Sequence, residues 1–93
     1  MFLDKLISLL AKAHISESMY AIYDKNDTLL AGRHGRGLQL DYHESWRVRD
    51  IEESRGNVFY EKHCDTEREA CIEFLKMTDD EFHLASHIPE FAE

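Results

Sequence analysis

The sequence predicts an α+β fold, with an antiparallel sheet of about four strands and an N-terminal helix and one or two C-terminal helices packed on one face. Apolar residues recur at helical spacing near the N-terminus and again after Thr66, and between them they alternate with polar residues at period two. A chain of 93 residues buries enough surface for one modest core, so we expect residues 1–93 to form a single domain.

The composition is that of a folded protein, with 43% hydrophobic and 11% aromatic residues. The N-terminal segment carries charges at Asp4 and Lys5 and has no small-residue cleavage site, so it does not resemble a signal peptide or a membrane span. We therefore expect a cytoplasmic protein with no membrane partner.

An amphipathic helix is predicted at the N-terminus. Its apolar face over residues 3–14 is formed by Leu3, Leu6, Ile7, Leu10, Ala11 and His14. Residues 18–23 are rich in aromatic and branched side chains and end at the turn-forming cluster 24–27, which predicts a first strand.

Leu29 and Leu30 begin or pack beside a short second strand, and residues 32–37 form a loop because they include three glycines. This loop also holds two arginines and a histidine, which could hold a phosphate. It lacks the lysine and the following helix of a P-loop, and a net charge of −8 repels a polyanion. We therefore interpret it as a solvated hairpin tip and expect no nucleic-acid partner.

Three further strands are predicted in the middle of the chain. Apolar and polar residues alternate over 38–43 and again over 46–49, as in half-buried strands. A turn at 53–57 then leads into a strand over 58–63.

The C-terminal third predicts two helices. Thr66 and Glu69 form a capping box, and the helix that follows has the apolar stripe Ala70, Cys71, Phe74 and Leu75. The same start pattern at residues 78–81 predicts a short last helix through His87, ended by Pro89. We expect the core to include Leu6, Ile7, Leu10, Leu38, Leu40, Trp46, Val48, Cys71, Phe74 and Leu75.

No metal, cofactor or catalytic group is predicted. Cys64, Cys71, His83 and His87 are acceptable zinc ligands, but their spacing is wrong for a compact finger, and Cys71 lies on the apolar stripe. We expect two reduced, structural thiols. No local pattern selects a nucleophile with its base, and His63 and Cys64 point to opposite faces of a strand, so we expect no enzyme.

Acidic charge is concentrated in the second half of the chain. From Asp50 to Glu93 there are 13 acidic and four basic residues, which favours a basic protein partner. The acidic residues 79–81 lie in the first turn of a predicted helix, where negative charge complements the helix dipole. The acidic residues near Asp50 lie at a predicted strand end, where like charges repel each other and gain nothing locally. The predicted partner-binding residues are Asp50, Glu52, Glu53, Tyr42, Tyr60, Asp79, Asp80 and Glu81.

A family resemblance rests on several short motifs. They are Trp46-x-Val48, Glu52-Glu53, the Arg55-Gly56 turn and Asp65-Thr66-Glu67-x-Glu69-Ala70-Cys71-x-x-Phe74-Leu75. This stretch resembles the C-terminal half of small immunity proteins encoded beside bacterial polymorphic and contact-dependent growth inhibition toxins. In those families the turn reads Glu-Arg-Gly, whereas Ser54 precedes the arginine here.

The resemblance implies a cytosolic, non-enzymatic inhibitor that binds one cognate toxin domain and blocks its active site. A basic nuclease or nucleotide-processing toxin fits the acidic charge of the chain. We expect a monomer or weak dimer. The alternative is a small metal-binding Cys/His regulatory module or an enzyme accessory subunit.

Overall fold

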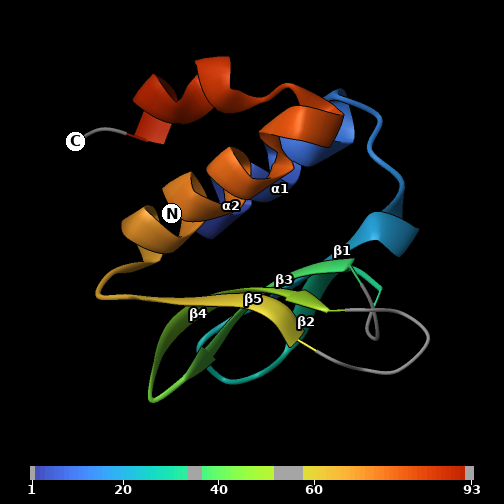
Figure 1. Ribbon diagram of the computed structural model, residues 1–93. Coiled ribbons are helices and arrows are strands. Elements are labelled where there is room, and N and C mark those ends of the chain that lie inside the picture. Colours follow the sequence, from blue (N-terminus) through green and yellow to red (C-terminus); the bar gives the residue numbers. More distant parts are fainter. Residues whose placement is uncertain (1, 34–36, 52–57, 92–93) are drawn as a thin grey trace.

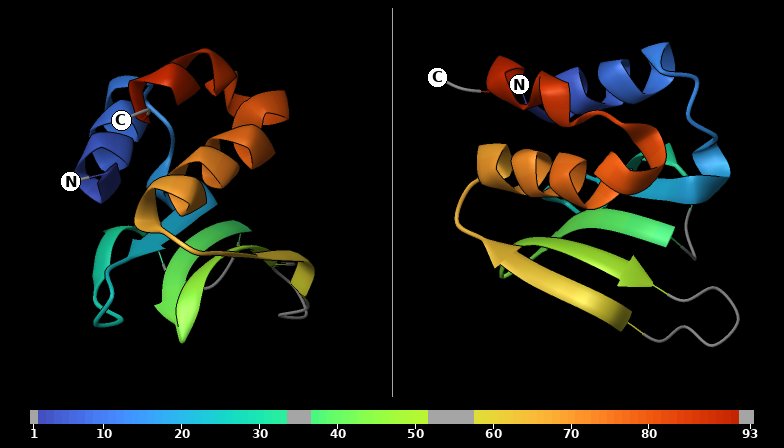
Figure 2. Two further views of the ribbon diagram at one scale, coloured as in Figure 1. Left: turned by 90° about the vertical axis from the view of Figure 1, so that its left-hand side faces the viewer. Right: turned by 45° about the horizontal axis from the view of Figure 1, so that its top comes forward.

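The computed structural model describes residues 2–33, 37–51 and 58–91. Its elements in chain order are helix α1 (Phe2–Lys12), 3-10 helix η1 (Glu17–Met19), strands β1 (Tyr20–Tyr23), β2 (Leu29–Gly32), β3 (Gly37–His43), β4 (Ser45–Ile51) and β5 (Val58–Cys64), helix α2 (Glu67–Phe82) and 3-10 helix η2 (Ala85–Phe91). The strands form one sheet, and α1, α2 and η2 all lie on one face of it (Figures 1 and 2). The predicted α+β architecture is confirmed.

The sheet differs from the prediction in two respects. It has five strands rather than about four, because the segment that begins at Leu29 forms a full strand, and it is mixed rather than antiparallel. The strand order is β2-β1-β3-β4-β5, in which β1 pairs antiparallel with β2 but parallel with β3, with Tyr20 opposite Leu38. A period-two pattern identifies a strand but not its neighbour, so it did not reveal the parallel pairing.

Two glycines explain how the chain passes from β2 to β3. Gly32 ends β2 with φ +84° and Gly37 begins β3 with φ +78°, on either side of the start of β1. A Cβ atom would lie 2.1 Å from the carbonyl oxygen of Tyr20 at Gly32, and 2.5 Å from that of Met19 at Gly37. At these two positions the backbone passes too close to the start of β1 for a side chain, and glycine also tolerates the positive φ angles found there. Residues 34–36 of the predicted loop lie outside the described residues.

One apolar cluster lies between the sheet and the helices. Helix α1 contributes Leu3, Leu6 and Leu10, and η2 contributes Phe91, whose ring lies near that of Phe2 with centroids 6.4 Å apart. Its largest fully buried side chains include Phe74, Leu75, Leu40 and Val48. All the predicted core residues are buried except Ile7, which is half-buried. The core prediction is therefore confirmed except at that position.

The N-cap at Thr66 is confirmed, although the Glu69 carboxylate accepts the N–H of Asp65, one residue before the cap, at 3.2 Å. The Thr66 hydroxyl accepts the backbone N–H of Glu69 at 3.1 Å and begins α2. The second predicted helix start is wrong. The pattern at residues 78–81 lies inside α2, where Thr78 is fully buried and its hydroxyl donates to the Leu75 carbonyl at 2.9 Å. Thr78 therefore lies in the interior of α2 and does not cap a new helix, and α2 continues through Phe82.

The C-terminal segment is a 3-10 helix. Helix α2 is capped at its C-terminus by His83, which adopts the left-handed conformation with φ 56° and donates its N–H to the Asp79 carbonyl at 2.9 Å. Pro89 lies within η2 rather than ending a helix. In the described part of the chain, no helix has the length and apolar character needed to cross a bilayer.

Candidate functional site

The sheet face opposite the helices carries polar side chains at alternate positions. On β3 these are Gln39 and Asp41, and on β4 they are Arg47 and Arg49. The antiparallel register places Gln39 opposite Arg49 and Asp41 opposite Arg47. Directly opposed side chains on one sheet face can interact, so the hairpin itself brings an acid and an arginine together.

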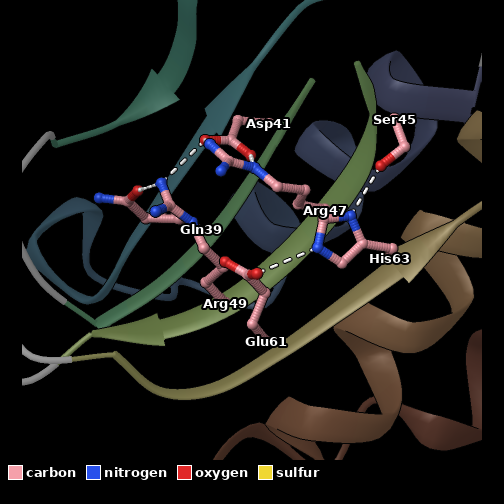
Figure 3. Close-up of polar contacts among 7 residues, drawn as sticks. All are labelled: Gln39, Asp41, Ser45, Arg47, Arg49, Glu61 and His63. Atoms are coloured by element: carbon pink, nitrogen blue, oxygen red, sulfur yellow. Dashed lines mark hydrogen bonds and ion pairs between the residues drawn. The ribbon is translucent and has the colours of Figure 1, made fainter. Parts of the chain in front are cut away.

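Asp41 is the centre of this network (Figure 3). Its carboxylate accepts Arg47 Nε at 2.9 Å on Oδ1 and Arg47 Nη2 at 2.8 Å on Oδ2. Arg49 Nη2 donates to the same Oδ2 at 2.9 Å and to Gln39 Oε1 at 3.0 Å. The hydrogen bond to Asp41 is the main reason that the pKa of the Arg47 guanidinium is raised. The Arg47 guanidinium is therefore held in its charged form.

The network is buried although all the helices that the structure describes lie on the other face. Asp41 is 4% exposed and Gln39 is 2% exposed, and the Arg47 and Arg49 side chains, 18% and 19% exposed, cover them. Three charge-assisted hydrogen bonds to one carboxylate hold the two guanidinium groups in place. The outer face thus presents arginines whose positions are set before any partner arrives.

A hollow of about 320 Å³ lies at this network. It is lined by Tyr23, Asp27, Gln39, Asp41, Tyr42, His43, Arg47 and Arg49. These side chains offer hydrogen-bond donors and acceptors and charges of both signs, but no serine, cysteine or lysine nucleophile.

A second chain of hydrogen bonds joins β4 to β5. Ser45 Oγ lies 2.7 Å from His63 Nδ1, and His63 Nε2 lies 3.0 Å from Glu61 Oε2 (Figure 3). These groups have the order of a nucleophile, base and acid, but the His63 and Glu61 side chains are 55% and 37% exposed and do not line the hollow. Triad chemistry relies on a site that excludes water and on oxyanion donors. We therefore interpret the contacts among Ser45, His63 and Glu61 as surface hydrogen bonds. Cys64, the neighbour of His63, is buried on the opposite face of β5, as expected.

The predicted partner-binding residues are only partly brought together. Asp50 on β4 lies directly opposite Tyr60 on β5, and Tyr60 is 44% exposed with its hydroxyl donating to Glu73 of α2 at 3.3 Å. Tyr42 is paired with Trp46 at the other end of β4, where their rings meet edge to face at 5.2 Å. Glu52 and Glu53 lie outside the described residues.

The second predicted acidic run lies in the helical layer. The carboxylate of Asp79 accepts the backbone N–H of Ala85 at 3.0 Å and so ties η2 to the end of α2. Asp80 and Glu81 belong to α2, but their side chains lie outside the described part of the structure. Asp79 therefore has a structural contact that a partner would have to share.

The cysteines are poorly placed for metal binding. Both thiols are free and buried, and burial raises the pKa of Cys64 and raises that of Cys71 to about 12. Metal ligation requires the thiolate, which this environment disfavours. His83 is exposed and His87 hydrogen-bonds Glu90. Within the described ranges, no three His, Cys, Asp or Glu side chains form a group that could hold a metal ion.

Sequence reasoning missed the four residues of the outer network. It identified the alternation on both strands but used only the apolar positions. The tight turn around Glu44, which has φ 65°, implies the pairing of Tyr42 with Trp46. That register alone would have placed Asp41 opposite Arg47 and so revealed the ion pair.

Comparisons with protein-family models, with curated proteins and with solved structures found no match for this chain.

Proposed function

We propose that this chain is a cytosolic, non-enzymatic immunity protein that binds a cognate toxin domain and neutralises it by blocking its active site. The observation that carries the proposal is the buried Asp41–Arg47–Arg49 network on the sheet face without helices. Apolar replacements of buried ion pairs are often neutral or stabilising, so stability alone is a weak reason for such a network. Rigid, hydrogen-bonded side chains on a sheet are well suited to recognition.

The charge of the chain supports a basic partner. The formal net charge is −8, and the excess of acidic residues lies between Asp50 and Glu93. A field of this sign accelerates the approach of a basic domain and disfavours acidic competitors. A nuclease or nucleotide-processing toxin, which must itself attract a polyanion, has the complementary charge. The resemblance of the motifs between Trp46 and Leu75 to immunity proteins supplies the class of partner.

The alternative of a Cys/His metal module finds less support. Its two thiols lie in the apolar core, and their raised pKa values oppose the thiolate form that a metal needs. A recognition surface accounts for the features of the outer face without requiring these thiols.

We expect the toxin to be encoded beside this gene, and co-expression with a toxin domain identified there tests the proposal. We expect growth to be restored and a stable complex to be purified, with the toxin's activity blocked in the complex. A toxin that kills equally well with and without this chain contradicts the proposal.

Association kinetics test the acidic part of the interface. Glu52→Lys with Glu53→Lys should slow association by about tenfold or more at low salt, because charges at an interface rim act mainly on the on-rate. The control is Asp4→Lys with Glu17→Lys, which makes the same change of charge at exposed positions in the N-terminal half. Equal effects of the two double substitutions would indicate steering by net charge alone. An unchanged, salt-independent on-rate of the Glu52→Lys, Glu53→Lys variant would place the interface away from these two residues.

A further inference from the structure

We propose that the hollow on the outer sheet face is a carboxylate-binding site, in which Arg49 binds the side chain of an aspartate or glutamate of the protein partner. That the carboxylate belongs to a protein partner rests on the proposed function. The chemistry of the site rests on the geometry of the two arginines.

The two arginines use their donors differently. Arg47 makes a two-point contact with Asp41 through Nε and Nη2, the arrangement that best satisfies a guanidinium fork. Arg49 donates to both Gln39 and Asp41 through one nitrogen, Nη2. Its Nε is buried and has no hydrogen-bond partner among the residues that the structure describes. Asp41 thus contacts both arginines, but Arg47 uses two nitrogens for this contact and Arg49 only one, so Arg49 retains donor capacity that an incoming acceptor can use.

An unsatisfied buried donor is unfavourable, which gives Arg49 a reason to respond to a ligand. A small rotation of its guanidinium would present Nε and a second nitrogen to the two oxygens of a carboxylate, and Arg47 would still hold Asp41. Arg49 would then be the residue that binds the ligand, and Arg47 and Gln39 would position the network around it.

The charges around the hollow favour a carboxylate over a phosphate. Arg47 and Arg49 face two acids, Asp41 and Asp27, so the four groups carry no net charge. Asp27 is near enough to help raise the pKa of Arg47. A dianionic phosphate would be repelled by both acids and by the charge of −8, whereas a single carboxylate matches the guanidinium fork at lower repulsion. Binding of a carboxylate in the hollow therefore depends more on its hydrogen bonds with Arg49 than on the electrostatic field of the protein.

NMR spectra of the arginine Nε–H groups, recorded on the intact protein during titration with a ligand, test this proposal. The probe is glutamate blocked as the N-acetyl amide, with equally blocked glutamine as the neutral comparison. We expect blocked glutamate to shift the Arg49 Nε–H resonance saturably in the millimolar range, and blocked glutamine to leave it in place. Arg49→Lys, which keeps the charge but loses the fork, should weaken binding by about tenfold or more. Arg33→Lys, the same exchange at an exposed position, should leave it unchanged.

A second variant keeps the test informative if Arg49→Lys perturbs folding. Asp27→Asn removes a negative charge from the lining at a position with φ 64°, which asparagine tolerates well. It should tighten binding of blocked glutamate several-fold at low salt, and the gain should fade at high salt.

Three outcomes would overturn the proposal. The first is a linear, unsaturated response, and the second is equal binding by the Arg49→Lys variant. The third is tighter binding of inorganic phosphate than of blocked glutamate. If blocked glutamate binds but folded Arg49→Lys forms the toxin complex with unchanged affinity, a free small carboxylate replaces the partner side chain as the ligand. A flat titration together with intact toxin neutralisation contradicts this inference alone and leaves the proposed function standing.

Discussion

Asp41 and Arg47 face each other across the β3–β4 hairpin and form a two-point ion pair, with Nε–Oδ1 and Nη2–Oδ2 distances of 2.9 and 2.8 Å. Their strands also supply the centre of the core, because Leu40 and Val48 are buried on the opposite face. One register therefore sets both the packing on the helical side and the charged network on the outer side. A slip by one residue would exchange the two faces and destroy both.

Replacement of Asp41 should destabilise the fold. Asp41→Asn removes the charge shared by two guanidinium groups, and we expect a loss of about 2–4 kcal/mol in the free energy of unfolding. This is below the effect for a fully buried pair because both arginines retain some contact with solvent. Urea titration measures the change. Asp27→Asn in the same hollow is the control and should stay within about 0.5 kcal/mol; equal effects of the two variants would contradict the central role of Asp41.

Addition of a side chain at Gly32 should disturb the crossing from β2 to β3. Gly32→Ala would place a Cβ 2.1 Å from the Tyr20 carbonyl oxygen in a left-handed backbone conformation. We expect a loss of at least about 2 kcal/mol, from the backbone conformation and from the displacement of β1. Thermal unfolding compared with Arg33→Ala, one residue further along and exposed, provides the measurement. A Gly32→Ala protein as stable as the parent would show that this connection tolerates a side chain.

Truncation of Trp46 should leave a cavity in the core. Trp46 is 9% exposed, belongs to the central cluster and contacts the Tyr42 ring edge to face. We expect Trp46→Ala to lower the free energy of unfolding by about 3–5 kcal/mol, enough to unfold much of a small domain. Circular dichroism with urea tests this, and Tyr60→Ala is the comparison because Tyr60 is 44% exposed. A melting temperature within a degree or two of the parent's would contradict the assignment of Trp46 to the core.

The buried thiol of Cys71 should make stability fall at alkaline pH. Burial raises its pKa from 9.0 to about 12, so the unfolded chain releases this proton at a lower pH than the folded chain. The stabilisation is fully present below pH 9 and is lost as the pH rises toward about 12, by about 1.4 kcal/mol per pH unit. Urea unfolding at several pH values measures the slope. Cys71→Ala should reduce this slope, although burial of Cys64 acts in the same direction; an identical slope would exclude Cys71 as its cause.

The elements with local patterns were predictable from the sequence. The cap at Thr66 depends on residues within one helical turn, and the stripe of α2 depends on a spacing of three and four residues. The alternation around Leu40 and Val48 likewise identifies strands and their buried faces. Such features are encoded by neighbours along the chain, so composition and periodicity were enough to identify them.

The second helix start failed because a local pattern has two meanings. Thr78 followed by Glu81 reads as a capping box, but in the structure it lies within α2, where Thr78 is fully buried. Whether a threonine hydroxyl caps a new helix or bonds the preceding turn depends on what surrounds it. That environment consists of residues far away in the sequence.

By itself, the sequence determined the N-terminal helix, the start of α2, most of the strands, nearly all of the core and the acidic character of the second half. Only the tertiary structure decided that β3 lies parallel to β1, and that Asp41, Arg47, Arg49 and Gln39 meet on the face away from the helices. The physical reason is that strand pairing joins residues distant in the chain, and an alternating pattern is equally compatible with several neighbours and registers. The packing of two glycines against β1 and the tight turn at Glu44 select one of these arrangements, and the candidate site exists only in that arrangement.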